Sequence, residues 1–516
     1  MRLSILLSLV SLAGSAFAAF GVTESNNHYV VDTNGGLVFT VNKATGDIIS
    51  LKYNSKECQD SSKFSHISSG LGSSNVVATT IGTNVIKITV TTDTLVHYYI
   101  AKSGTPAVFM GTYITAEPTI GELRFISRLS KTALPNGVAE SEIAGGSVVE
   151  GSDIFLVNGQ TRSKFYSSVP FIDDSVHCVT GANVAACMAI GSYESSSGGP
   201  FFRDIDNQGS SQQELYFYMN SGHVQTEAYR MGFHGPYALI FTSGSTASVP
   251  DFSFYDNLSL SGWFPTSGRG RVSGTVSGVS DGVVHWYNSA AQYWVRSSGS
   301  YTSPYMKPGT YTMVLYKTEL KVATSTVTVS AGGTVTKNIA SAEDVPRSVI
   351  FRIGAVDGRP TGFKNADKQA KMHPSDSRMS SWAATTFIWG TSSTADFPMA
   401  QIKSVNDPTT IEVTLSSSQA AVARTLRIFT TLSFAGGRPS VKVNSYSPST
   451  PAAPTKIDSR GFTRGAYRGY GEVYSFTIPA GSLVTGKNTI QISCASGSSG
   501  TTFLNPNFIF DSVEFY

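Results

Sequence analysis

Charged residues are scarce in this chain and make up only 14% of its 516 residues. The formal net charge is +3, which is too small to indicate a protein that binds nucleic acid. Beyond the N-terminus, no segment is long and apolar enough to cross a bilayer, which takes ~20 residues. Heptads, helical repeats and low-complexity tracts are absent as well. These absences exclude a coiled coil and predict neither nucleic acid nor membrane as a partner.

Cysteine is rare too, with four residues in the chain. Their spacing does not match a zinc site. In an oxidising compartment, the closeness of Cys178 and Cys187 in sequence predicts a disulfide across a short loop. Cys58 and Cys494 lie far apart in sequence, and their state stays open.

The N-terminus has the pattern of a signal peptide. Residues 1–18 carry one arginine, an apolar run and a small-x-small ending, Ala16-Phe17-Ala18. A membrane anchor is the alternative, but the apolar run is shorter than the ~20 residues of a bilayer span. We therefore predict a secreted, extracellular protein whose mature chain begins at Ala19. The sequon at Asn257 predicts a glycosylation site and agrees with secretion.

Many short segments rich in β-forming residues follow, separated by turns of Gly, Ser and Asn. This pattern predicts an all-β protein, and the length predicts more than one domain. After the signal peptide at 1–18, we expect a large antiparallel β-sandwich at 19–264 and a small fibronectin type III-like sandwich at 265–344. A jelly-roll domain of the carbohydrate-binding kind is expected at 345–516. A sandwich fold alone does not establish sugar binding.

The stretch LYFYMNSGHVQTEAYRMGFHGPYAL, residues 215–239, concentrates titratable side chains. Leu215, Phe217 and Met219 alternate with Tyr216 and Tyr218. A strand would therefore place the two sets on opposite faces. We expect one face to pack in the core and the other to line a cleft.

Several segments resemble the rhamnogalacturonan lyases of polysaccharide lyase family 4, in the same order along the chain. They are GELRFISRL, NGQTRSKFYS, LYFYMNSGH, FRIGAVDGRPTGFKN, MHPSDSR and SRGFTRGAYRGYGEVY. The resemblance covers nearly the whole mature chain, with its three-domain layout, and is nearest to the secreted fungal members. It implies an endolyase that cleaves rhamnogalacturonan I, a pectin backbone, between rhamnose and galacturonate. The reaction is a β-elimination that leaves an unsaturated galacturonate at the new non-reducing end.

Such a β-elimination needs a base for the C5 proton of galacturonate, cations near its carboxylate, and an acid for the leaving oxygen. By the family's motifs, the resemblance implies Lys164 as base and His223 as acid. Arg162 would share a face with Lys164 on an extended chain and would lower the pKa of the lysine. From the residues alone, His223 and His234 are equal candidates for the acid. The resemblance selects His223 and leaves His234 as a structural or supporting group.

The resemblance also implies residues that bind substrate. Tyr216 and Tyr218 match the family's tyrosines, and tyrosines can stack on sugar faces and donate hydrogen bonds. The family has a functional arginine in the strand ELRFISRLS, where we prefer Arg124 and keep Arg128 as the alternative.

Three arginines recur at every fourth position near the C-terminus: Arg460, Arg464 and Arg468. Arginine forks can clamp carboxylates with two hydrogen bonds. Arg464 best matches the family's position, and it would bring the third domain into the cleft. Since lysine and arginine can supply the positive charge, we expect catalysis to need no metal or other cofactor. The sequence contains no acidic loop of the DxDxDG type, yet a structural calcium ion stays open.

Two other classes of function remain open from the sequence. A non-catalytic, secreted pectin-binding protein could be assembled from the same three sandwiches. A glycoside hydrolase would need two opposed carboxylates, and no motif here singles out such a pair. We therefore expect a monomeric lyase whose partner is the polysaccharide rhamnogalacturonan I.

Overall fold

The computed structural model describes residues 19–117, 122–150, 154–158, 160–164, 169–222, 228–343, 348–366, 382–455, 471–498 and 505–516. Strands dominate this part of the chain, which confirms the predicted all-β class. The helical segments described are short: α1 (Val138–Ile143), α2 (Ser417–Ala420), η1 (Ser253–Asn257), η2 (Thr266–Gly268), η5 (Thr394–Asp396) and η6 (Ala480–Ser482). None of these is long and apolar enough to cross a membrane. The predicted signal peptide lies outside the described residues.

The first domain contains four antiparallel sheets. The N-terminal sheet has the order β1 (Gly21–Ser25), β2 (His28–Asp32), β3 (Leu37–Asn42), β4 (Ile48–Tyr53) and β5 (Lys56–Glu57). The largest sheet has the order β15 (Val176–Gly181), β16 (Val184–Ile190), β19 (Gly232–Thr242), β10 (Ala107–Ile114), β9 (Leu95–Lys102), β8 (Val85–Thr91) and β7 (Asn75–Ile81). A shorter sheet has the order β17 (Asn207–Gly209), β18 (Gln213–Ser221), β11 (Glu122–Leu129) and β6 (His66–Ile67). The fourth consists of β12 (Ser147–Glu150), β13 (Ile154–Val157) and β14 (Gln160–Ser163).

The largest sheet and the β18 sheet share one hydrophobic core. Phe217 of β18 and Phe125 of β11 contact Tyr237 of β19, with ring centroids 4.7 Å and 6.0 Å apart. All three rings are almost completely buried. The core face of β18 therefore packs against the largest sheet, and its other face points away from this core.

A disulfide braces the edge of the largest sheet. Cys178 of β15 and Cys187 of β16 lie directly opposite each other in the antiparallel register and are bonded, which confirms the predicted pair. Cys58 and Cys494 are buried free thiols in two different domains. The sequon residue Asn257 is exposed at the end of η1.

The second domain is a sandwich of two four-stranded sheets. One sheet contains β23 (Ser300–Thr302), β20 (Arg271–Ser277), β26 (Thr334–Thr336) and β27 (Ile339–Ala340). The other has the order β22 (Gln292–Ser297), β21 (Gly282–Tyr287), β24 (Gly309–Lys317) and β25 (Leu320–Val329). Its own core contains the fully buried Trp286.

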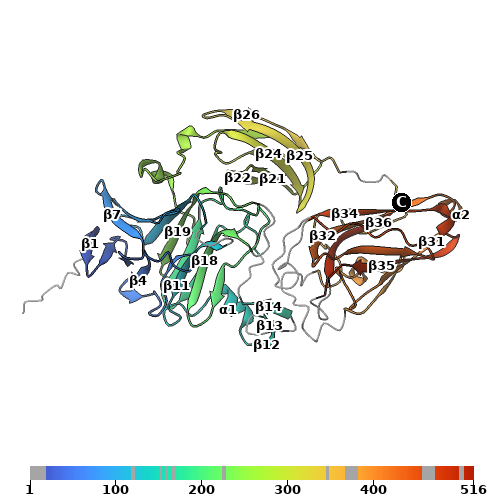
Figure 1. The fold of residues 1–516 in the computed structure, drawn as a ribbon, viewed down its shortest axis with the longest axis horizontal. Helices are drawn as coiled ribbons and strands as arrows, with labels where there is room; N and C mark the ends of the chain where they lie inside the picture. The colour runs from blue at the N-terminus through green and yellow to red at the C-terminus, as the bar shows by residue number, and fades with distance from the viewer. Residues whose placement is uncertain are drawn as a thin grey trace, which may run out of the picture.

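The third domain is also a sandwich with its own core. One sheet has the order β28 (Phe351–Gly354), β36 (Asn507–Phe515), β32 (Arg424–Phe434) and β34 (Glu472–Ile478), with β30 (Ala400–Ile402) paired to β36. The other has the order β29 (Thr386–Ile388), β31 (Thr409–Leu415), β35 (Gly486–Ala495) and β33 (Arg438–Val443). Figure 1 shows the second domain spanning above the first and third domains.

Buried polar contacts join the domains. Glu194 of the first domain pairs with Lys307 of the second at 2.6 Å, and Arg203 of the first pairs with Glu319 of the second at 2.9 Å. The backbone N–H of Glu319 donates to the carbonyl of Asp357 in the third domain at 3.1 Å. The domain seams thus carry specific, directional contacts in addition to packing.

Candidate active site

Strands β11 and β18 bring the predicted tyrosines and arginines together on one sheet face. Side chains alternate between faces along a strand, so residues two apart share a face. Leu215, Phe217 and Met219 belong to the main hydrophobic core, whereas Tyr216 and Tyr218 form a separate cluster. This confirms the predicted division of β18 into two faces. The directly opposed pairs on the outer face are Arg124 with Tyr218, Ile126 with Tyr216, and Arg128 with Glu214.

Arg124 and the two tyrosines form one compact group. The rings of Tyr216 and Tyr218 stack with centroids 5.7 Å apart and an angle of 20°. The guanidinium of Arg124 lies 5.7 Å and 5.3 Å from the two ring centroids and donates to the hydroxyl of Tyr218. The tyrosines are only 4% and 3% exposed. The tyrosine rings therefore form a buried support for Arg124, whose side chain is 15% exposed, and offer no open ring faces.

The charge of Arg124 is only weakly countered. Its nearest carboxylate, Glu122, lies 3.4 Å away, and the side chain of Glu122 is 39% exposed. The buried Nε of Arg124 has no hydrogen-bond partner among the described residues. A buried donor without a partner carries a free-energy cost.

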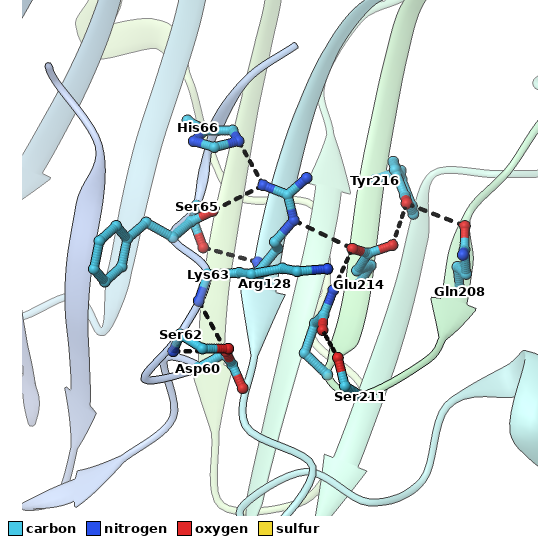
Figure 2. A network of polar contacts seen from close by, with 12 residues as sticks. Asp60, Ser62, Lys63, Ser65, His66, Arg128, Gln208, Ser211, Glu214 and Tyr216 are labelled. Carbon is cyan, nitrogen blue, oxygen red and sulfur yellow. Dashed lines mark hydrogen bonds and ion pairs between the residues drawn. The ribbon is translucent and has the colours of Figure 1, made fainter. Parts of the chain in front are cut away.

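Arg128, the alternative arginine, is already paired. Its Nε lies 3.2 Å from Oε1 of Glu214, and its Nη1 donates to the carbonyl of Phe64 at 3.2 Å and to Nε2 of His66. Figure 2 shows Arg128 in the middle of this network, between His66 and Glu214. Of the two arginines, Arg128 is therefore the more fully paired.

Lys164 directly follows β14 and is partly exposed. Helix α1 packs against both β14 and β17, and β17 pairs with β18, so the lysine segment is held near the tyrosine strand. Ser163 lines a cavity of about 580 Å³ together with His177 and Asp206. His177 in turn contacts the backbone of Tyr216. This cavity therefore links the lysine segment to β18.

His177 is a mostly buried histidine, 9% exposed in its side chain, that contacts the backbone of the tyrosine strand. Its Nδ1 lies 2.9 Å from Oδ1 of Asp174, and its Nε2 donates to the carbonyl of Tyr216 at 2.7 Å. Burial alone would lower the pKa of His177, but the carboxylates of Asp174 and Asp206 and these hydrogen bonds raise it to about 9. The imidazolium therefore anchors the backbone of β18 at Tyr216.

Asp174, His177 and Asp206 also form the one group of three acidic or histidine side chains close enough to share a metal ion within the described ranges. Their ligand atoms all lie within 4.8 Å of one another. Both ring nitrogens of His177 already have partners, so a metal would have to displace one of them. The arrangement is explained as a buried ion-pair cluster.

Three family models match successive parts of the chain. They are described as "Rhamnogalacturonan lyase B, N-terminal" at 20–262, "Polysaccharide lyase family 4, domain II" at 268–337, and "Polysaccharide lyase family 4, domain III" at 349–515. The chain belongs to polysaccharide lyase family 4. Rhamnogalacturonate lyase A of Aspergillus aculeatus is 56% identical over 528 residues, which cover 100% of both chains. Rhamnogalacturonate lyase A of Emericella nidulans is 55% identical over 524 residues, which cover 99% of each chain.

As a member of this family, the protein is a polysaccharide lyase with the predicted three-domain architecture. The predicted acid of this lyase, His223, lies outside the described residues, as do Arg460, Arg464 and Arg468. The competing histidine, His234, is described. It is completely buried on β19, its Nε2 donates to the carbonyl of Arg230 at 3.1 Å, and burial lowers its pKa to about 3. A neutral, buried histidine of this kind supports the fold and has no proton to donate at neutral pH.

Two charged residues of the lyase were missed by sequence reasoning. Glu214 precedes Tyr216 and Tyr218 at the same spacing of two, so the alternation along β18 was a usable signal that it shares their face. His177 had only a weak signal, because Asp174 stands three residues before it, whereas its other partners, Asp206 and the backbone of Tyr216, are distant in sequence.

Proposed function

We propose that this protein is a secreted, monomeric endolyase that cleaves the backbone of rhamnogalacturonan I by β-elimination between rhamnose and galacturonate. The observation that carries the proposal is the group of Arg124, Tyr216 and Tyr218 on one sheet face of a family 4 lyase. The substrate class comes from the full-length relatives, which are named rhamnogalacturonate lyases. The carboxylates of an acidic polysaccharide can form charge-assisted hydrogen bonds with an arginine such as Arg124.

Lys164 is proposed as the base. It is partly exposed directly after β14, and its sequence neighbour Ser163 lines a cavity of about 580 Å³. The amine of Lys164 takes the C5 proton of galacturonate, and the released electron pair forms the C4–C5 double bond. The C4–O bond breaks, and the rhamnose oxygen takes a proton from His223. The support for His223 is its position in the family motif, and the same holds for Arg464 as a second carboxylate clamp.

Arg124 is proposed to bind the galacturonate carboxylate. Negative charge spreads onto this carboxylate when the C5 proton leaves, so a nearby cation lowers the barrier. The side chain of Arg124 is 15% exposed, so part of the guanidinium is accessible to supply this charge. Because the protein supplies this cation, catalysis is proposed to need no metal, and any calcium ion would be structural. Treatment with a strong chelator should leave turnover unchanged.

The test is an elimination assay that follows the ultraviolet absorbance of the new double bond during incubation with rhamnogalacturonan. Lys164→Ala should reduce turnover by roughly 100-fold or more. Lys164→Arg should be just as inactive, because arginine keeps the charge but does not release its proton at assay pH. Lys52→Ala, which alters an exposed lysine on β4, is the matched control and should behave as wild type.

The same assay separates the competing functions. A pectin-binding protein without activity would retain polysaccharide but generate no absorbance, and a hydrolase would release reducing ends without the chromophore. Full activity of Lys164→Arg would show that the lysine acts as a charge and not as the base. A rapid fall in viscosity at low extent of reaction is expected for the proposed endolytic mode.

A further inference from the structure

Glu214 lies beside the proposed substrate-binding group and has no role in the chemistry described so far. Its side chain is 9% exposed and stands directly opposite Arg128 in the β11–β18 register. Its two oxygens accept three hydrogen bonds: from the hydroxyl of Tyr216 at 2.5 Å, from Nε2 of Gln212 at 2.6 Å, and from Nε of Arg128 at 3.2 Å. Figure 2 shows the carboxylate between Arg128 and Tyr216.

The bond to Tyr216 decides where the hydroxyl hydrogen points. A phenol has one hydrogen, and two acceptors lie near it: Oε2 of Glu214 at 2.5 Å and Oε1 of Gln208 at 3.3 Å. The hydroxyl therefore donates its hydrogen to Glu214, which is the closer acceptor and is charged. Burial and the neighbouring carboxylate of Glu214 both raise the pKa of Tyr216 far above its usual value, so the phenol stays neutral. Towards a ligand, the Tyr216 oxygen can then act only as an acceptor.

The same bond stabilises the surface under Arg124. The ring of Tyr216 stacks on Tyr218, and the guanidinium of Arg124 rests against both rings. Glu214 is in turn held by Arg128, whose partner His66 contacts Asp47 at 3.1 Å through Nδ1. A chain of polar contacts therefore runs from the neighbouring β6 strand to Tyr216, and ring contacts of Tyr216 with Tyr218 and Arg124 continue it to the arginine that is proposed to bind the substrate carboxylate.

Fold stability does not require this chain of contacts. The opposite face of the same strand reaches the same burial with Leu215, Phe217 and Met219. Buried ion pairs lose hydration that their mutual attraction often only offsets, so apolar residues would stabilise the sheet at least as well. The polar contacts of Glu214 with Arg128 and Tyr216 instead hold these side chains in one arrangement.

We infer that Glu214 is a positioning residue for the lyase: it orients the hydroxyl of Tyr216 and thereby fixes the Tyr216–Tyr218 pair against which Arg124 meets the acidic sugar. The inference rests on the proposed function, because it presumes that Arg124 contacts galacturonate.

Glu214→Gln is the direct test. The amide must turn its oxygen towards the donors Arg128 and Gln212, so its NH₂ group faces Tyr216. The tyrosine hydroxyl must then accept from this amide and donate to Gln208 instead, which turns its hydrogen and takes up one of the two lone pairs that a ligand could use. We expect KM for elimination, and Kd for an unsaturated, non-reactive oligosaccharide measured by calorimetry, each to rise roughly tenfold, while kcat changes less than about threefold.

Glu514→Gln is the matched control. Glu514 is fully buried and directly opposes Arg427 across β36 and β32 at 2.7 Å, as Glu214 opposes Arg128. This control should lower the midpoint of thermal unfolding without changing KM or Kd. If Glu214→Gln also lowers only the unfolding midpoint, Glu214 is merely structural and the inference is overturned.

A double-mutant cycle shows whether Glu214 acts through Tyr216. Tyr216→Phe keeps the ring and removes the hydroxyl, so Glu214→Gln added to it should raise Kd by less than about twofold more. Additive effects would contradict the proposed route. If the wild type binds oligosaccharide but eliminates nothing, the proposed function fails, and the Kd values still decide the role of Glu214.

Discussion

The two faces of β18 are buried to the same degree but built from opposite chemistry. Leu215, Phe217 and Met219 are at most 1% exposed and pack in the main core. On the other face, Tyr216 and Tyr218 are 4% and 3% exposed and are held by hydrogen bonds and ion pairs. The core face can be satisfied by any apolar side chain of suitable shape. The outer face needs particular partners at particular distances.

This difference teaches that burial alone does not identify a structural residue. Charged groups buried in place of apolar side chains lose the free energy of their hydration, but their hydrogen bonds hold them in one defined geometry. In a family 4 lyase, the outer face of β18 is therefore the place to look for function, and four changes in and around the two faces test this view.

The largest effect is expected on the core face. Phe217→Ala should lower the free energy of unfolding by about 3–5 kcal/mol, because it removes a buried ring that packs against Tyr237 and Tyr193. Urea-induced unfolding followed by fluorescence measures this loss. Enzyme that remains folded should keep its KM. A loss below about 1 kcal/mol would show that the two faces do not differ in the way described.

His177 supports the outer face from beneath and should make stability depend on pH. Its folded pKa of about 9 lies above the ordinary 6.5. The stabilisation is therefore fully present below pH 6.5 and is lost as the pH rises through about 9. It amounts to about 3 kcal/mol.

The variant His177→Gln should abolish this part of the pH dependence. Thermal unfolding from roughly pH 6 to pH 10 measures it, because this range contains both the ordinary and the folded pKa of His177. His234 has the opposite sign, because its pKa is lowered to about 3. Its contribution is present above the ordinary pKa and is lost as the pH falls towards 3. Equal slopes for wild type and His177→Gln in the alkaline range would contradict the assignment of charge to His177.

The disulfide next to His177 should have a somewhat smaller effect. Cys178 and Cys187 are nine residues apart, and opening so short a loop should cost about 2–3 kcal/mol by the loop-entropy relation. The double variant Cys178→Ser/Cys187→Ser, unfolded in urea, tests this. Its KM should stay near wild type, since the bond braces β15 and does not touch the tyrosines.

The smallest change in stability is expected for Tyr218→Phe on the outer face. Removing the hydroxyl takes away one acceptor of Arg124 and should cost only about 1 kcal/mol of unfolding free energy. KM should nevertheless rise roughly twofold to tenfold, because Arg124 loses part of its orientation. A variant with unchanged KM would mean that the outer face does not guide substrate binding.

Local patterns in the sequence determined much of this protein. Alternation in residues 215–219 set the two faces of β18, turn-rich spacing set the all-β class, and the closeness of Cys178 and Cys187 set the disulfide. These features depend on side-chain periodicity or short chain separation, which a sequence records directly. Motif resemblance added the family, the proposed base Lys164 and the proposed acid His223.

Only the tertiary structure shows which charges are compensated. Arg124 and Arg128 share a face four residues apart, and the preference for Arg124 came from the family resemblance and not from the pattern itself. The structure pairs Arg128 with Glu214 and leaves the Nε of Arg124 without a described partner. The pKa of His177 is likewise raised by its sequence neighbour Asp174 and further by Asp206, which only the fold brings close. Whether a charge is compensated depends on which side chains are close in space. Pairing between strands that are distant in sequence determines these contacts, and local periodicity does not record it.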